Sequence, residues 1–103
     1  MKKQRIVTTD TNQLYQAILA LKTADQAQRF FADLLTVDEL AEFSKRWQTA
    51  QLLAGGLSYE EITNQTNLSS TTIARVSRCL TGPMGGYRLA LNQSHHHALK
   101  SQH

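Results

Sequence analysis

The stretch that decides the fold is residues 58–80, which read SYEEITNQTNLSSTTIARVSRCL. Its first four letters, a Ser followed three residues later by a Glu, form a capping box and predict a short helix over 59–66. The Ser pair at 69–70 predicts the cap of a second helix, which continues through Leu80. Two short helices this close in sequence predict a helix-turn-helix over about residues 58–81.

The interior of such a motif makes definite demands on the sequence. Asn67 stands at the turn, and Asn is second only to Gly in tolerating a left-handed backbone. Leu68 directly after it is expected to fill the corner between the helices. The residues expected inside the two helices are Ile62, Thr66, Ile73 and Val76. The alternative is an ordinary helical hairpin whose spacing matches by chance.

The outward face of the second helix is polar. With Ile73, Val76 and Leu80 turned inward, this face carries small uncharged side chains near the helix N-terminus and arginines farther on. Such a helix suits the major groove, because the backbone can approach closely, hydroxyls can bond phosphates or base edges, and arginines can contact phosphate or guanine. The predicted DNA-binding residues are Ser69, Ser70, Thr71, Thr72, Ala74, Arg75 and Arg78.

The charge distribution agrees with an anionic partner. Eleven Lys and Arg against eight Asp and Glu give a net charge of only +3, but every acid lies between Asp10 and Glu61. Residues 62–103 carry four cations and no acid, and a second basic cluster lies at Lys2, Lys3 and Arg5 at the start of the chain. This asymmetry favours double-stranded DNA or an anionic membrane, and the alternative is uneven surface charge.

Length and composition exclude several classes of protein. A chain of 103 residues with 41% hydrophobic and 18% charged residues predicts one globular domain. No apolar run is long enough to span a membrane and no secretory segment opens the chain, so we expect a soluble, cytoplasmic protein. A single cysteine, Cys79, excludes an intramolecular disulfide framework and any multi-cysteine zinc site. No glycine-rich phosphate loop is present.

The rest of the chain is predicted to be helical, which makes the fold class all-α. Residues 1–10 are expected to be a flexible basic arm, 11–91 a helical domain, and 92–103 a disordered polar tail. Within the domain, helices are expected from about Thr11, from Thr23 or Ala24, over 37–54 and over 87–91, besides the two of the helix-turn-helix. Apolar faces on the first three helices predict the core of a homodimer with twofold symmetry.

These motifs together resemble the Trp repressor family, over about residues 12–91. The motifs that carry the resemblance are LLTVDE at 34–39, KR at 45–46, the capping box at Ser58 and TIAR at 72–75. RVSRCL at 75–80 and GGY at 85–87 resemble the YerC/YecD branch of that family. The resemblance implies a six-helix fold, an intertwined homodimer built from the N-terminal helices, and operator binding through the helix-turn-helix.

The resemblance also implies a pocket between the third helix and the recognition helix, where the Trp repressor holds L-tryptophan. Thr36, Arg46, Thr72 and Arg75 match positions used there for backbone contacts, the ligand carboxylate and stacking on the indole. However, Cys79 replaces a serine near the ligand's amino group, Val76 replaces a glycine, and the segment 46–58 is one residue shorter. The effector is therefore not expected to be tryptophan. The possible effector pocket comprises Thr36, Arg46, Thr72, Arg75 and Cys79.

Three roles remain open for the paired arginines. Arg46 and Arg75 can clamp another small carboxylate, since guanidiniums bind carboxylates in a bidentate manner, or they can serve the structure or contact DNA phosphate. Trp47, next to Arg46, is expected in the core or the dimer interface.

The predicted function is a sequence-specific DNA-binding transcriptional regulator, a repressor that acts as a homodimer. The alternative is a protein-interaction module that binds a transcription partner. An enzyme is the weakest hypothesis, because no base accompanies Cys79 and no catalytic site is found. The histidines at 95–97 and His103 lie in a polar tail without supporting groups, so neither a metal site nor a cofactor is expected.

Overall fold

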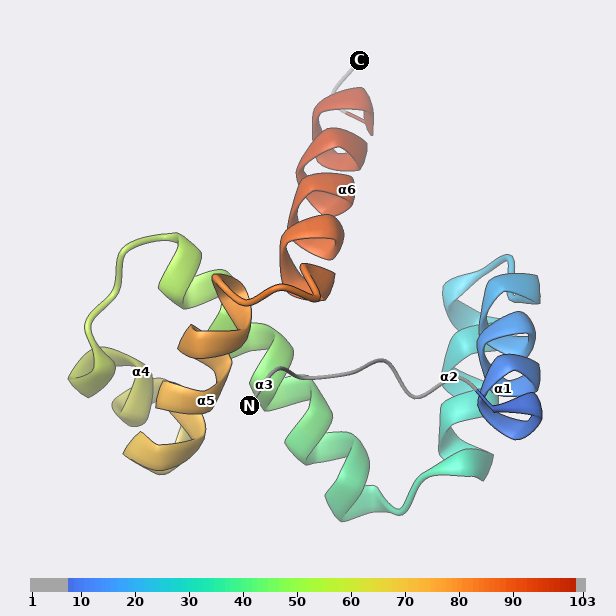
Figure 1. Ribbon diagram of the computed structural model, residues 1–103, viewed down its shortest axis with the longest axis horizontal. Helices are drawn as coiled ribbons and strands as arrows, with labels where there is room; N and C mark the ends of the chain where they lie inside the picture. The colour runs from blue at the N-terminus through green and yellow to red at the C-terminus, as the bar shows by residue number, and fades with distance from the viewer. Residues whose placement is uncertain (1–7, 102–103) are drawn as a thin grey trace. The chain divides into compact units, whose positions relative to one another are not determined.

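Six helices and no strand make up the described part of the chain (Figure 1). The computed structural model describes the backbone of residues 8–101 and the side chains of residues 8–94. The helices are α1 (Thr9–Ala20), α2 (Ala24–Leu34), α3 (Val37–Ala54), α4 (Tyr59–Thr66), α5 (Ser70–Leu80) and α6 (Gly86–Ser101). The predicted all-α class is confirmed. The chain divides between Glu42 and Phe43 into two compact units.

Helix α1 begins earlier than the sequence predicted. Thr8 is its N-cap, and its hydroxyl accepts from the Thr11 amide at 3.2 Å, while the Thr8 amide donates to the Thr11 hydroxyl at 2.8 Å. The prediction of a flexible arm over 1–10 is therefore wrong for residues 8–10, because Thr11 takes the place that Glu or Gln holds in most capping boxes. The remainder of that arm, residues 1–7, lies outside the described residues.

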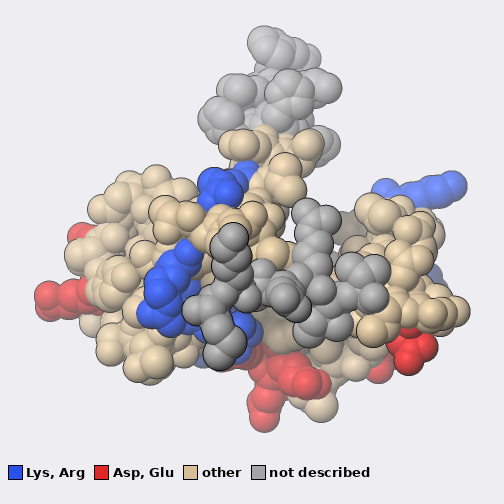
Figure 2. Space-filling model, in the orientation of Figure 1, with Lys and Arg blue, Asp and Glu red and all other residues tan. Residues whose placement is uncertain are grey.

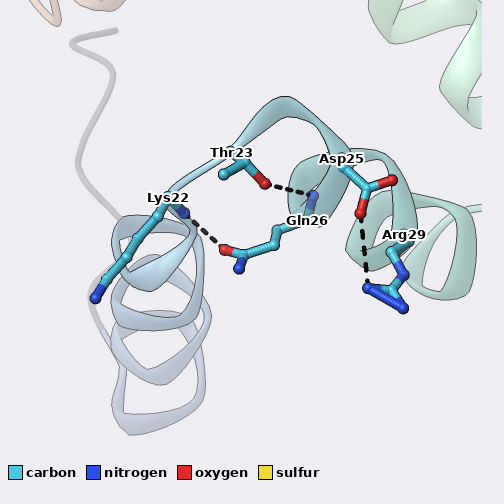
Figure 3. Close-up of polar contacts among 5 residues, drawn as sticks. All are labelled: Lys22, Thr23, Asp25, Gln26 and Arg29. Atoms are coloured by element: carbon cyan, nitrogen blue, oxygen red, sulfur yellow. Dashed lines mark hydrogen bonds and ion pairs between the residues drawn. The ribbon is translucent and has the colours of Figure 1, made fainter.

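The corner between α1 and α2 is held by short polar contacts (Figure 3). The Thr23 hydroxyl accepts from the Gln26 amide at 3.1 Å, and the Gln26 side chain accepts from the Lys22 amide at 2.9 Å. Thr23 is thus the N-cap of α2, and the helix begins at Ala24, one of the two predicted starts. Asp25 and Arg29 form an exposed ion pair one turn apart, at 3.6 Å. Such pairs contribute little to stability, so the cap is the stronger local determinant.

Neither α1 nor α2 buries a side chain completely. Phe30 and Phe31 pack edge to face with ring centroids 5.5 Å apart, but both remain half-buried. Large apolar side chains exposed in this unit are Tyr15, Ile18, Leu19, Leu34, Val37 and Leu40. Isolated exposed apolar residues are normal, but a whole helix pair without a buried side chain is incomplete as a core.

Helix α3 is bounded by the signals the sequence contains. Thr36 and Glu39 form a capping box, with contacts of 2.9 and 3.1 Å between each amide and the other side chain. At the other end, the Gly56 amide bonds to the Leu53 carbonyl and the Leu57 amide to the Leu52 carbonyl. This is a Schellman motif, and Gly56 supplies its left-handed residue with φ of 89°.

The core of the second unit lies around the helix-turn-helix. Ile62, Leu68 and Ile73 form its buried cluster, with half-buried leucines of the α3 end and the following loop packed against them, namely Leu52, Leu53 and Leu57. Val76 is 1% exposed. The interior predicted for residues 62–76 is thus confirmed residue by residue, because Thr66 is buried as well.

The turn between α4 and α5 has the predicted geometry. Asn67 adopts φ of 60° and ψ of 14°, the left-handed conformation, and its amide donates to the Thr63 carbonyl at 2.8 Å. The buried Thr66 hydroxyl donates to the Ile62 carbonyl at 2.8 Å and accepts from the Leu68 amide at 3.2 Å. These hydrogen bonds therefore give a partner to each of the polar groups that they join at the corner.

Helix α6 is longer than predicted. The sequence analysis expected a short helix over 87–91 and disorder from Asn92, whereas α6 continues to Ser101. Residues 87–101 contain no Gly or Pro, and Ala98, Leu99 and Lys100 are good helix formers, so nothing in the segment ends the helix. The prediction of a disordered tail is wrong for the backbone of 92–101, while residues 102–103 lie outside the described part.

The turn residue gives a direct test of this corner. Asn67→Ala should lower the free energy of unfolding by about 1–2 kcal/mol, because an alanine Cβ opposes the left-handed conformation. Asn67→Gly should stay within about 1 kcal/mol of the parent protein, since Gly relieves that strain but gains freedom when unfolded. Urea denaturation measures both, with Asn64→Ala in the exposed part of α4 as a control. Equal stability of the Ala and Gly variants would contradict the argument.

Candidate nucleic-acid interface

The N-terminus of α5 is a capped helix end rich in hydroxyls. The Ser69 hydroxyl accepts from the Thr72 amide at 3.2 Å and lies 3.1 Å from the Thr72 hydroxyl, and the Ile73 amide bonds to the Ser69 carbonyl. Ser69 and Thr72 are therefore oriented by each other. Each hydroxyl can make more than one hydrogen bond, so a serine that caps the helix can still donate a hydrogen bond to an acceptor outside the protein.

The exposed face of α5 contains most of the predicted DNA-binding residues. Ile73 and Val76 are buried on the inner face, which fixes what lies opposite. The predicted residues that are exposed are Ser69, Ser70, Thr71, Arg75 and Arg78. Thr72 and Ala74 are half-buried at the edges of that face. The structure thus places all seven on or beside one helix, with the two arginines one turn apart.

The charged side chains on α5 are all positive. Helix α5 contains no acid, and Figure 2 shows Lys and Arg atoms over it. From residue 43 onward the only acids are Glu60 and Glu61, both in the first turn of α4. A hydrogen bond from the Ser58 amide at 2.8 Å, aided by the Ser58 hydroxyl, lowers the pKa of Glu61. That carboxylate is thus used as a helix cap, where negative charge is favourable.

The C-terminus of α5 is tied to the beginning of α6. Arg88 donates to the Leu80 carbonyl at 2.5 Å, so a guanidinium satisfies one of the last carbonyls of α5. The guanidinium lies over Gly85, where an added Cβ would be 3.0 Å from Arg88 Nη2 and where φ is 71°. Sequence reasoning missed this contact, since a bond across eight residues leaves no periodic signal.

An aromatic pair links α3 to α6. Trp47 and Tyr87 stack with ring centroids 6.5 Å apart and planes inclined by 18°. Burial raises the pKa of Tyr87, and the nearby Cys79 thiol raises it further, while Arg46 and Arg75 lower it. The phenol of Tyr87 therefore lies within electrostatic reach of side chains from both α3 and α5.

Three of the five predicted pocket residues influence the pKa of Tyr87. Arg46, Arg75 and Cys79 all act on its phenol. The other two have local tasks: Thr36 caps α3 in the first unit, and Thr72 completes the cap of α5. Sequence analysis used Tyr87 only as part of the GGY motif and assigned it no contact, because a tyrosine after two glycines gives no indication of the helix it will face. The pocket residues stay a prediction.

The described residues contain neither a candidate metal cluster nor a candidate membrane span. Among residues whose side chains are described, no three His, Cys, Asp or Glu gather closely enough to hold a metal ion. The side chains of the histidines at 95–97 and of His103 lie outside that part. In the same part of the chain, no helix combines the length and the apolar character needed to cross a membrane.

Comparison with known proteins shows which family this fold and sequence are similar to. A family model described as Trp repressor protein matches residues 9–95. The Bacillus subtilis (strain 168) protein YerC, itself uncharacterized, is 34% identical over 93 residues, 90% of this chain and 89% of YerC. A TrpR-like protein from Eubacterium eligens has a TM-score of 0.77 at 38% identity, covering 84% of this chain and 89% of that one. A candidate Trp repressor from Staphylococcus aureus has a TM-score of 0.81 at 31% identity, covering 86% and 89%. The resemblance seen in the sequence, with its six-helix fold, is confirmed.

The raised pKa of Tyr87 predicts a pH dependence of stability. An unfolded tyrosine ionises near pH about 10, whereas Tyr87 in the fold keeps its proton to higher pH. The stabilisation of the fold by the protonated Tyr87 phenol is thus complete below about pH 10. It is lost as the pH rises through the raised pKa of Tyr87 in the folded protein. Tyr87→Phe should remove this decline, which urea denaturation across alkaline pH measures. Cys79→Ala should lower the pKa of Tyr87, visible in the tyrosinate absorbance, and an unchanged pKa would contradict the assignment.

Proposed function

The chain belongs to the Trp repressor family, and from this we propose that it is a sequence-specific DNA-binding transcriptional regulator that acts as a homodimeric repressor. The observation that carries the proposal is the exposed face of α5, which is polar, free of acids and held from behind by buried Ile73 and Val76. A helix presented in this way, as the second helix of a helix-turn-helix, suits the major groove.

The two ends of the recognition face have different tasks in this proposal. Ser70 and Thr71 lie at the helix N-terminus, where amides and hydroxyls meet phosphate oxygens or base edges. Arg75 and Arg78 lie farther along and contact phosphate or guanine. Repression follows if the bound protein occupies a site that polymerase needs. The two small residues at 70–71 let the backbone come close to the DNA.

The dimer is proposed because a single chain leaves apolar side chains of α1 and α2 exposed. Helices α1 and α2 bury no side chain completely, although α2 carries an apolar stripe, and Leu19 is 76% exposed. A second copy with the same faces would cover them in a self-complementary way. One helix-turn-helix reads only a few base pairs, whereas a symmetric pair places two recognition helices about 34–36 Å apart, in successive major grooves.

The phosphate contacts can be tested through the salt dependence of binding. Selection from random duplexes should enrich a roughly palindromic site, to which the protein binds with a steep salt dependence. Arg75→Ala and Arg78→Ala should each weaken binding and lower the slope of log K against log salt by about 1 per phosphate contact. Fluorescence anisotropy at several salt concentrations measures this. An arginine that reads guanine would instead relax the sequence preference at one base pair.

A matched control is available on α2. Arg29 is exposed and paired with Asp25, so Arg29→Ala removes the same charge from the first unit. It should leave the slope unchanged, because the proposed interface lies on α5. The proposal fails if no duplex is retained at low salt, or if all three variants lose the same slope, since a general charge effect would then suffice.

The dimer has its own prediction. Sedimentation equilibrium of the parent protein should give twice the chain mass of 11.6 kDa. Leu34→Lys places a charge on the apolar stripe of α2 and should shift the equilibrium to the monomer or destabilise the fold, because a buried lone charge is costly. Gln28→Lys, on the exposed part of the same helix, should change neither mass nor stability. A monomeric parent protein would contradict the proposal.

A further inference from the structure

Helix α5 is held by the core along only part of its length. Its buried side chains are Ile73 and Val76, so no side chain of this helix beyond Val76 is fully buried. Cys79 and Leu80, in the last turn, are half-buried. The last turn also contains Arg78, one of the proposed DNA-binding residues. Contacts other than core packing therefore hold this part of α5.

Three successive carbonyls at the end of α5 have hydrogen-bond partners. The carbonyls of Arg78 and Cys79 accept from a hydroxyl and an amide directly after the helix, at 3.5 and 3.2 Å. The Leu80 carbonyl accepts from the Arg88 guanidinium at 2.5 Å. The last carbonyls of a helix lack partners within it, so all three bonds cap this end. Of the three, the bond from Arg88 is the one that comes from another helix.

Arg88 is poorly placed for the helix in which it lies. It is the third residue of α6, where the positive end of the helix dipole disfavours a cation. The first turn of α6 contains no acid, and the sequence has none after Glu61. The C-terminus of α5 is the negative end of that helix, so a cation is favourable there. The guanidinium therefore gains its electrostatic stabilisation from α5 rather than from α6.

Gly85 leaves space for this guanidinium. It has φ of 71°, and an added Cβ would lie 3.0 Å from Arg88 Nη2. Gly56 is also left-handed, with φ of 89°, but an added Cβ there would have no atom within 4 Å. Gly86 likewise has no atom within 4 Å of an added Cβ. Among these three glycines, Gly85 alone combines a left-handed backbone with proximity to Arg88.

We propose that Arg88 is a positioning residue for DNA recognition: its bond to the Leu80 carbonyl fixes the last turn of α5 and thereby directs Arg78 towards DNA. This rests on the proposed DNA-binding function. Because the bond joins α5 to α6, the position of that turn also depends on the short segment 81–85 between the two helices (Figure 1). The competing role is a direct contact of Arg88 with DNA phosphate, since Arg88 is exposed and a guanidinium has further donors.

A double-mutant cycle separates positioning from direct contact. Arg88→Ala should weaken binding to the selected duplex by about fivefold, because a hydrogen bond from a charged group is lost. In the Arg78→Ala background the same change should cost less than about twofold, because residues that act through one contact are not additive. Fluorescence anisotropy measures the four proteins, each shown to be folded by circular dichroism. Equal losses in both backgrounds would overturn the proposal and indicate an independent phosphate contact.

Gly85→Ala tests the same bond without removing a charge. The added Cβ should displace the guanidinium from the Leu80 carbonyl and weaken DNA binding by about threefold. Gly56→Ala strains the backbone at the end of α3 without meeting a side chain, and Gly86→Ala adds a methyl group in open space. Both controls should bind within about twofold of the parent protein. A Gly85→Ala protein that binds like the parent, or a Gly56→Ala protein that loses as much affinity, would overturn the proposal.

Amide hydrogen exchange gives a readout that needs no DNA. Loss of the bond should speed exchange at residues 78–82 by about fivefold relative to residues 62–66, because a helix end frays when its cap is lost. Arg88→Ala and Gly85→Ala should both show this change, whereas the control Arg29→Ala, on α2, should not.

The exchange measurement separates this inference from the proposed function. Unchanged exchange in both Arg88→Ala and Gly85→Ala would refute the positioning role, even in a protein that binds DNA. A parent protein that binds no DNA would refute the proposed function, while faster exchange in these two variants would still support Arg88 as the residue that holds the end of α5.

Discussion

The left-handed turn at Asn67 is the constraint on which the rest of the second unit depends. Because Asn67 has φ of 60°, α4 ends there and the chain changes direction. Leu68 then packs with Ile62 and Ile73 in the buried cluster. A right-handed residue at this point would extend α4 and carry Leu68 away from that cluster. Because Ile73 and Val76 are buried only when the corner closes, the polar face of α5 is exposed as a consequence of the same turn.

The fold and the candidate interface were predictable to different degrees. Helix starts were readable where a side chain caps the adjacent amides, as at Thr36, Ser58 and Ser69, because a cap acts within three residues. The start of α1 was missed since Thr11 replaces the usual Glu or Gln of a capping box. These are local signals, so a sequence contains them whether or not the tertiary structure is known.

Contacts between distant residues could not be predicted in the same way. Tyr87 meets Trp47 across forty residues and Arg88 meets the Leu80 carbonyl across eight, and neither pair follows the period of a helix. The sequence showed which residues of α5 face outward, since burial of Ile73 and Val76 follows from periodicity. It did not show that Tyr87 stacks on Trp47, because that depends on how α6 begins after the left-handed Gly85.

The distribution of buried residues bears on how this protein would be regulated. Every buried side chain among residues 8–94 belongs to the segment from Thr49 to Val76, so α5 rests on the best-packed part of the described chain. This packing is present at all times, whereas a bound ligand would add to it in proportion to its concentration. A ligand can shift an equilibrium only by its differential affinity for two states. Because the buried core under α5 needs no ligand to form, the proposed DNA binding would respond to protein concentration, dimerisation and salt.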